Sequence, residues 1–327
     1  MGANMEMAID LGKWKSYVVM EENVIVVKEG YTYTTKEGFS AFFEEVDNPK
    51  IIVEASSNTN WIANMFEGYD LTVAHPAKVR LISQSVKKTD KNDAHTLMDL
   101  YKKDYLPKSY LPIREVRDAR DLCRDRALAV RQRVAIVNKI KYHAFCLGID
   151  VKRLGKKNRK ILGNEPKLEL LLRQLDETDA TIGEYDKRIH DIVQNGKSLV
   201  SHYARLIDTI PGFGPCASLI IAAEIGDINR FHDEFRLFSF AGVVPRTHQS
   251  GDNEWKGHIV KGNTFLKSVL LQCANIHTRF GKSSIVTYWY EENRDRIGRK
   301  KAKIASMKRL LRIIYWMLKR DEEYHDQ

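Results

Sequence analysis

The stretch Lys87-Lys-Thr-Asp-Lys-Asn-Asp-Ala-His-Thr-Leu97 decides how the first third of the chain is interpreted. Thr89 stands where a helix N-cap is expected, so the pattern predicts a helix that starts near Asp90. Asp90 and Asp93 are three residues apart, which places both carboxylates on one face of that helix. Two anions held this close repel unless a cation lies between them, and hard divalent metals bind such oxygen ligands. The stretch therefore indicates half of a metal site.

Acidic residues in a first helical turn also have a simpler explanation, because the helix dipole stabilises them without any metal. Two further acids upstream favour the metal interpretation. Met7-Ala-Ile-Asp10 and Lys50-Ile-Ile-Val-Glu54 each read as a short buried strand that ends in a carboxylate. Acids at successive element ends are the arrangement of RNase H-like metal nucleases, in which two divalent ions hold the scissile phosphate. The four acids are Asp10, Glu54, Asp90 and Asp93.

The rest of residues 1–112 has the pattern of a mixed α/β sheet with these acids at one edge. Further strands are expected at 16–20, 24–27 and 71–74, and helices at 37–46 and 58–66. A Pro-containing, non-periodic segment from Leu106 to Pro112 then marks the boundary to the next domain.

Charge is divided unevenly along the 327 residues. The net charge is +10, yet residues 1–104 carry 12 basic and 16 acidic side chains, which leaves 41 basic and 27 acidic ones for the remainder. This asymmetry suggests an acidic catalytic module joined to a module that binds a polyanion, nucleic acid before membrane.

The cysteines and the hydropathy pattern indicate the compartment. The four cysteines form no C-x-x-C pair and no zinc set, which predicts reduced thiols. No long apolar run and no signal-peptide pattern are present, so we expect a soluble, intracellular protein.

A strongly basic, helical region follows the boundary: residues 105–163 contain 16 basic and five acidic side chains. Near-heptad apolar spacing predicts a helix from Val116 to Leu147, with Lys167 to Val193 as the returning helix of an antiparallel pair or of a coiled coil between protomers. The basic residues beside the seam form either a solvated face with local salt bridges or phosphate contacts, and the continuing basic excess favours phosphate. The residues beside the seam are Arg117, Arg120, Arg124 and Arg131, and the basic excess continues through Lys156 and Lys157.

Two more helices are expected to join through Pro211-Gly-Phe-Gly-Pro215. Gly212 and Gly214 permit a tight turn and expose backbone N–H groups. This is the helix-hairpin-helix pattern, which holds a backbone phosphate without reading sequence. An ordinary helical corner is the other interpretation, and the Ile-Pro-Gly-x-Gly-Pro core favours DNA contact.

Phe238 to Asn263 contains a serine in a polar segment. Ser250 precedes a glycine in what reads as a loop, and a lone loop serine is usually a turn residue rather than a nucleophile. Near the end of the chain, a basic cluster precedes an amphipathic helix from Ile304 to Leu318. Candidate phosphate contacts in these two segments are Arg246, Lys256, Lys261, Arg299, Lys300 and Lys301.

Together these motifs resemble the DEDD transposases of the IS one-ten family, the bridge-RNA-guided recombinases to which the Piv-type DNA invertases are related. The resemblance is nearly full length. It implies a RuvC-like, RNase H-like domain over 1–112, a helical coiled-coil arm over 113–200, and a mostly helical transposase domain over 201–327. It rests on Ile9-Asp10-Leu-Gly12, Val53-Glu54, Lys88-Thr-Asp90-Lys-Asn-Asp93, Ile210-Pro-Gly-Phe-Gly214, Ala241-Gly-Val-Val-Pro-Arg246, Gln249-Ser250-Gly251 and Lys261-Gly-Asn263.

The resemblance also implies the chemistry. The acid quartet would bind one or two Mg²⁺ ions, and Ser250 would attack DNA to form a transient 5′-phosphoserine link. A structured guide RNA would pair with target and donor double-stranded DNA, so that the protein reads mainly backbone and shape. Dimers would assemble into a tetramer in which the acids of one protomer act with the serine of another. The alternatives are a Piv-like site-specific invertase, a RuvC-like junction endonuclease, and a non-catalytic RNA-binding protein.

Overall fold

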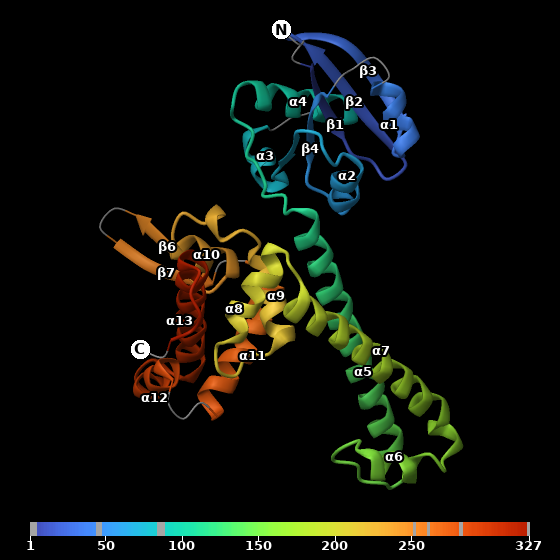
Figure 1. Ribbon diagram of the computed structural model, residues 1–327, viewed down its shortest axis with the longest axis vertical. Helices are drawn as coiled ribbons and strands as arrows, with labels where there is room; N and C mark the ends of the chain where they lie inside the picture. The colour runs from blue at the N-terminus through green and yellow to red at the C-terminus, as the bar shows by residue number, and fades with distance from the viewer. Residues whose placement is uncertain are drawn as a thin grey trace. The chain divides into compact units, whose positions relative to one another are not determined.

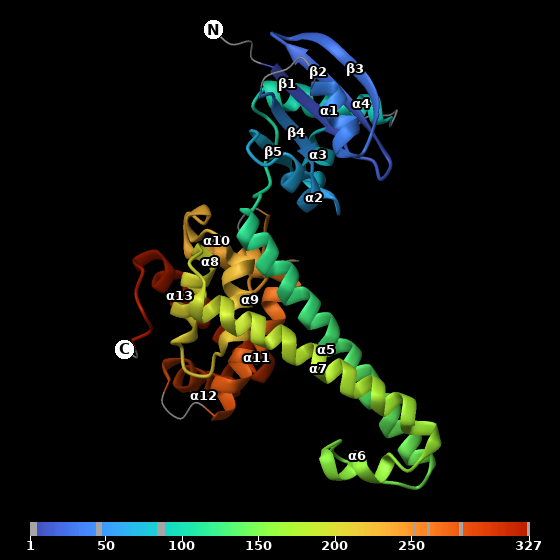
Figure 2. The ribbon, with the colours of Figure 1, turned by 45° about the vertical axis from the view of Figure 1, so that its right-hand side comes forward.

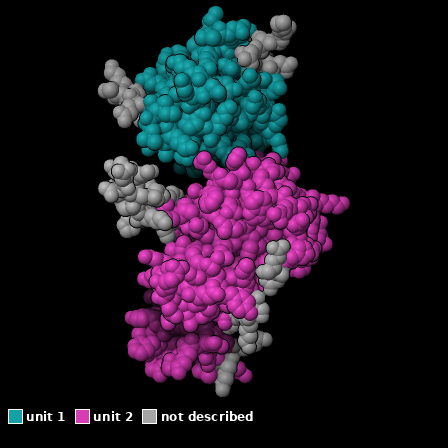
Figure 3. Space-filling model, turned by 90° about the vertical axis from the view of Figure 1, so that its left-hand side faces the viewer, with its two compact units in different colours: residues 1–112 teal, residues 113–327 magenta. Residues whose placement is uncertain are grey.

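The chain forms two compact units, residues 1–112 and 113–327, which are coloured separately in Figure 3. The computed structural model describes residues 5–43, 48–83, 89–250, 253–259, 262–280 and 284–325. The backbone alone is described at 43, 156–157, 246–250, 253–259 and 280. Within these ranges, no helix is long and apolar enough to cross a membrane.

The first unit is a five-stranded mixed sheet with helices on both faces (Figures 1 and 2). The strand order is β3-β2-β1-β4-β5. β1 to β3 pair antiparallel, whereas β4 lies parallel to both β1 and β5. The elements are β1 (Met5–Asp10), β2 (Lys15–Glu22), β3 (Ile25–Tyr33), α1 (Lys36–Phe43), β4 (Lys50–Glu54), α2 (Thr59–Met65), β5 (Leu71–Ala74), α3 (Pro76–Ile82) and α4 (Asp90–Lys102).

Alternate residues of the central strands enter two different cores. Ile9 of β1 and Val53 of β4 belong to the core that α1 and α2 cover, whereas Ala8 and Ile52 belong to the core of α3 and α4. A strand segment that is buried on both faces is apolar at successive positions, which is why residues 7–9 of β1 and 51–53 of β4 read as continuous apolar runs. The predicted mixed α/β sheet is confirmed.

The second unit is mostly helical and contains one two-stranded hairpin. Its helices pack around α9, which is buried from Ser218 to Ile225 because it is apolar on nearly every side. The elements are α5 (Arg114–Cys146), α6 (Lys156–Leu162), α7 (Pro166–Asn195), α8 (Leu199–Asp208), α9 (Pro215–Ile225), the 3₁₀ helix η1 (Ile228–Arg230), α10 (Glu234–Ala241), β6 (Pro245–Ser250), β7 (Asn253–Ile259), α11 (Thr264–Phe280), α12 (Ile285–Ile297) and α13 (Arg299–Arg320).

Helices α5 and α7 run side by side in opposite directions and, with α6, form an arm (Figures 1 and 2). The start of α5 and the end of α7 belong to the main core of the unit, and the far ends form a second core with α6. Between the two cores, the ion pairs Arg126–Asp186 and Arg133–Asp179 join the helices. The two predicted long helices therefore pair with each other within one chain.

Two elements differ from the sequence expectation. Ser250 is expected in a loop, but it is the last residue of strand β6 and lies opposite Asn253 of β7. The sequence of this hairpin is polar and lacks the alternation of apolar residues by which strands are usually predicted. The strands still pair, because the hydrogen bonds between them join backbone groups. Helix α3 is not expected either, since it has only seven residues, although the proline at its start is favourable in a first helical turn.

Candidate active site and nucleic-acid interface

Strands β1 and β4 bring two of the acids to one edge of the sheet. The strands are adjacent and parallel, with Ile9 opposite Val53, and each ends in its acid, Asp10 and Glu54. Adjacent parallel strands end at the same edge of a sheet. Asp10 and Glu54 each come directly after a residue of the pair Ile9 and Val53, so both acids lie at that edge. Both are half-buried.

Helix α4 adds the other two acids. The Thr89 side chain accepts a hydrogen bond from the Asn92 backbone N–H at 3.2 Å, which confirms the predicted N-cap. Ala94 packs on Tyr17, the residue of β2 that lies opposite Asp10. The first turn of α4, which contains Asp90 and Asp93, therefore lies beside the strand that carries Asp10.

Tyr31 of β3 contacts this group, although its sequence position gives no hint of it. The Tyr31 hydroxyl donates a hydrogen bond to Oδ2 of Asp90 at 3.3 Å. Partial desolvation, followed by the charge of Asp90 and more weakly that of Asp10, raises the pKa of Tyr31. Glu29 on the same strand binds Lys91, and this hydrogen bond lowers the pKa of Glu29.

The four acids are chemically suited to a divalent ion, although the described structure does not bring them together as a complete ligand set. Among the described residues, no three acidic, histidine or cysteine side chains lie close enough to hold a metal by themselves. All four donors are nevertheless hard carboxylate oxygens, and Glu54 and Asp93 form no side-chain hydrogen bond or ion pair with any described residue. Mg²⁺ is usually held by one or two carboxylates, substrate phosphates and water, which matches such an open set of donors.

The basic stripe of α5 is turned partly inward. Arg117 is only 5% exposed, and Arg120 donates to two backbone carbonyls at the end of α9, at 2.7 and 3.0 Å. Arg124 is half exposed and pairs with the buried Glu224 at 2.8 Å. The prediction of a solvent-facing stripe is therefore wrong for Arg117 and Arg120, whereas Arg131 is exposed.

An open groove of about 830 Å³ lies between α5, α10 and the start of α11. Arg124 and Arg131 line it, together with Ser239, Thr264 and Ser268. Guanidinium and hydroxyl groups are the donors that phosphate oxygens accept, so the groove is chemically suited to a nucleic-acid backbone.

The two helices and the tight turn of the predicted helix-hairpin-helix are present where α8 and α9 meet. Gly212 has a φ of +83°, a backbone conformation that L side chains adopt rarely. Gly214 is the N-cap of α9 with an extended backbone, and Pro215 is the first residue of that helix. The turn geometry is thus confirmed, and its contact with phosphate stays a prediction.

The remaining predicted contacts lie on three segments. Three cations form the first turn of α13, where all are exposed: Arg299, Lys300 and Lys301. The first two residues of α6 are Lys156 and Lys157. The hairpin that contains Ser250 also contains Arg246 and Lys256. Only the backbone of these four basic residues is described. Lys261 lies outside the described residues.

Family models match both units. A model for DEDD transposases of the IS110 group, described as "Transposase", matches residues 7–148, which include all four acids. A second, described as "Transposase IS116/IS110/IS902 family", matches residues 204–289, which include Gly212 and Ser250. Together they cover more than half of the chain. The chain belongs to this transposase family. It is therefore a DNA transposase/recombinase, which confirms the enzyme class expected from the motifs.

Curated relatives of the transposase agree. It is 25% identical over 292 residues to the "Transposase for insertion sequence element IS1111A" of Coxiella burnetii, across 84% of this chain and 79% of the relative. It is 25% identical over 303 residues to the "Probable family 20 transposase" of Pseudomonas aeruginosa, across 86% and 88%. It is 28% identical over 246 residues to the "Pilin gene-inverting protein" of Moraxella bovis, across 61% and 76%.

Proposed function

We propose that this transposase exchanges DNA strands with an RNase H-like metal site and a serine nucleophile. The observation that carries the proposal is the meeting of Asp10 and Glu54 at the shared end of two parallel strands, with the first turn of α4 beside them. Asp10, Glu54, Asp90 and Asp93 would hold one or two divalent ions, with Mg²⁺ as the biological choice. Bound there, the metal supplies Lewis-acid stabilisation of charge on the scissile phosphate.

In the proposed step, the hydroxyl oxygen of Ser250 attacks the phosphorus atom of a DNA phosphodiester. The bond to the 3′-oxygen breaks, and that oxygen leaves as a 3′-hydroxyl with the proton that the serine has lost. The 5′-phosphate stays on Ser250, so the energy of the ester bond is kept. A 3′-hydroxyl from another strand then attacks the phosphoserine, which restores the serine and joins the strands without ATP. Arg246, Lys256 and Lys261 are proposed to offset charge on the pentacoordinate phosphate.

The metal half is tested by Asp10→Asn, with Glu6→Gln at the opposite end of the same strand as the matched control. Asp10→Asn should abolish strand exchange and weaken Mn²⁺ binding measured by calorimetry, while nucleic-acid binding remains. Glu6→Gln should leave all three unchanged. Normal strand exchange by Asp10→Asn would refute the metal proposal.

The serine half is tested by Ser250→Ala, with Thr247→Ala on the same strand as the control. A substrate nicked near the cleavage position should trap a protein–DNA adduct in the wild type and in Thr247→Ala. Ser250→Ala should give no adduct and no strand exchange. If Ser250→Ala exchanges strands at the wild-type rate, a water or a 3′-hydroxyl attacks directly and the serine mechanism is wrong.

We further propose that the basic segments bind DNA and a structured guide RNA. Cations are disfavoured in the first turn of a helix, because the helix dipole is positive there. Arg299, Lys300 and Lys301 nevertheless occupy the first turn of α13, which contains no acidic residue. Such a cluster is expected where an external polyanion compensates the charge. Binding should then weaken steeply with salt, and replacing the three residues by glutamine should reduce the log–log slope by about three.

RNA that co-purifies with the transposase distinguishes a guided recombinase from a junction endonuclease, which would need neither guide nor Ser250. Recovery of one discrete RNA species supports guidance, whereas random fragments argue against it. The second candidate reaction is site-specific inversion, which the similarity to the pilin gene-inverting protein of Moraxella bovis favours. A plasmid that carries two target sites distinguishes inversion from insertion. Inversion reverses the segment between the sites without changing the length of the plasmid, whereas insertion makes the plasmid longer.

We propose a tetramer with active sites shared between protomers. Mixing Asp10→Asn protomers with Ser250→Ala protomers tests this arrangement directly. Activity should return in the mixture if one protomer supplies the acids and another the serine. It should stay absent if both halves of a site must come from one chain.

A further inference from the structure

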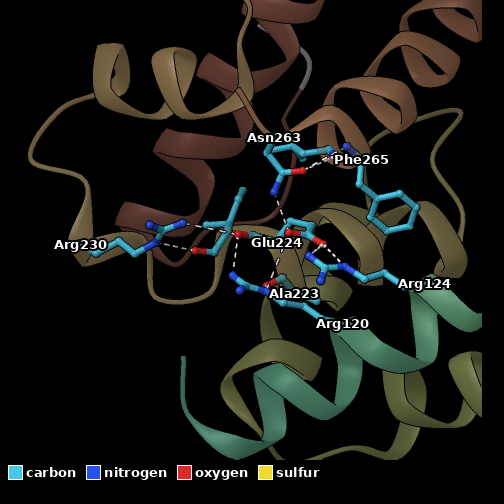
Figure 4. A network of polar contacts seen from close by, with 9 residues as sticks. Arg120, Arg124, Ala223, Glu224, Arg230, Asn263 and Phe265 are labelled. Carbon is cyan, nitrogen blue, oxygen red and sulfur yellow. Dashed lines mark hydrogen bonds and ion pairs between the residues drawn. The ribbon is translucent and has the colours of Figure 1, made fainter. Parts of the chain in front are cut away.

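Helix α9 contains a carboxylate in an otherwise apolar environment. Glu224 is 1% exposed, between apolar residues that form the centre of the main core. Its Oε1 accepts hydrogen bonds from Nη2 and Nε of Arg124 at 2.8 and 3.2 Å, and its Oε2 accepts one from Nδ2 of Asn263 at 2.7 Å (Figure 4). Replacing a buried, ion-paired carboxylate and its partner by apolar residues of similar size is often neutral or stabilising, so stability alone does not explain a glutamate at this position.

Glu224 lies where three elements meet. Arg120 and Arg124 of α5 reach it from one side, and Arg230 of η1 donates to the carbonyl of Ile225 at 2.8 Å (Figure 4). These arginines satisfy carbonyl groups at the end of α9 that lack helical partners. The end of α9 is therefore held firmly against α5 and η1.

Asn263 connects this junction to the hairpin β6–β7. Its Oδ1 accepts hydrogen bonds from the backbone N–H groups of Phe265 and Leu266 at 3.1 and 3.0 Å, so it is the N-cap of α11. Its own backbone N–H donates to the carbonyl of Phe240 at 2.7 Å. Asn263 thus contacts α9, α10 and α11 at once.

The two ends of the hairpin are held at the same point. The chain leaves α10 at Gly242 and returns at Gly262, and a Cβ atom on Gly262 would lie 2.3 Å from the Gly242 backbone nitrogen. Only a glycine permits this approach of the two backbones. An isolated two-stranded hairpin is marginally stable in water, so its direction depends on these fixed ends.

We propose that Glu224 is a positioning residue that orients the hairpin, and with it Ser250, through its hydrogen bond to Asn263. The inference rests on the proposed serine chemistry, because orientation matters only if the hairpin carries the nucleophile. A displacement of the reacting atom by about 1 Å costs on the order of 100-fold in rate. Glu224 itself is buried and touches no substrate in this scheme.

The test reverses the hydrogen bond. Asn263→Asp keeps a helix-capping oxygen but places a second carboxylate against Glu224. In the double variant Asn263→Asp with Glu224→Gln, the glutamine amide donates to the aspartate and the single negative charge beside Arg124 is restored. Asn263→Ser, which caps well but cannot reach Glu224, is the mild single variant in case the others fold poorly.

Two measurements are made on the full-length protein. The first is the single-turnover rate of adduct formation on a nicked duplex, compared with the Kd for the same duplex. Asn263→Asp should lower the rate by about 100-fold with little change in Kd, and the double variant should recover most of that loss. The second is hydrogen exchange of the backbone amides of residues 245–259. This exchange should be faster than in the wild type in Asn263→Asp and in Asn263→Ser, and it should return toward the wild-type rate in the double variant.

The outcomes separate the two proposals. Unchanged exchange in the hairpin of Asn263→Asp overturns the role of Glu224. A parallel loss of rate and affinity that the double variant does not recover overturns it too, because a general packing defect would behave in that way. If the hairpin exchanges as expected but the wild type forms no adduct, Glu224 still positions the hairpin and the serine mechanism fails.

Discussion

Replacing Gly212 by alanine should loosen the turn between α8 and α9. Gly212 has a φ of +83°, and a Cβ atom there would lie 2.9 Å from Cγ2 of Ile276 on α11. A left-handed backbone costs an L residue about 1–2 kcal/mol. The close contact adds to this, because Ile276 is β-branched and stiff at χ1. The smaller conformational freedom of alanine in the unfolded chain offsets about 0.4–1 kcal/mol. We therefore expect a net loss of about 1–2 kcal/mol in the free energy of unfolding.

Gly214 is the matched control two residues away. Its φ is −143°, and a Cβ atom there would meet nothing within 4 Å. Alanine restricts the unfolded chain but is a poorer N-cap than glycine, so the two effects oppose each other and Gly214→Ala should unfold close to the wild-type temperature. In scanning calorimetry, Gly212→Ala should lower the transition of residues 113–327 by about 2–8 °C. DNA affinity should fall with it if the turn binds phosphate. Equal melting temperatures for the two variants would refute the reasoning.

Two further predictions concern side chains whose surroundings the structure defines. Burial raises the pKa of the Cys123 thiol well above its usual range and that of Cys273 to about 12, whereas Cys146 is exposed. At pH 8, iodoacetamide should therefore modify Cys146 long before the two buried thiols, and peptide mass spectrometry would contradict this if all three reacted together. Tyr31→Phe removes the hydrogen bond to Asp90, which frees the Asp90 carboxylate for a metal ion. Mn²⁺ should then bind about twofold to tenfold more tightly in calorimetry. An unchanged affinity would show that the Tyr31 hydroxyl does not compete with the metal for Asp90.

Much of the first unit could be predicted from the sequence, because its signals are local. Strands β4 and β5 have the predicted bounds, since each is a short apolar run between polar turns. The N-cap Thr89 bonds to the backbone N–H of Asn92, only three residues further along the chain. The ends of two parallel strands then determine where Asp10 and Glu54 meet, so the edge of the sheet followed from the strand assignments alone.

The arginines of α5 could not be placed in this way. Arg120 and Arg124 look like a basic stripe when only their own helix is considered. Their partner Glu224 lies about a hundred residues further along the chain, and nothing local says that α9 packs against α5. One signal was available, because a glutamate inside the apolar run Leu219-Ile-Ile-Ala-Ala-Glu224-Ile225 needs a buried cation wherever that helix is enclosed. The hairpin of Ser250 gave no comparable signal.

The two cores of the arm make its length adjustable. Helix α5 has 33 residues and spans about 50 Å, and most of its buried apolar residues belong to the two cores near its ends, with Ala129 buried between them. The ion pairs Arg126–Asp186 and Arg133–Asp179 lie between them, seven residues apart on each helix. Inserting seven residues into both helices at this point would lengthen the arm by about 10 Å and rotate its tip by about 20°, while both cores keep their packing. Such an insertion would change the reach of the arm without altering the residues around Glu224.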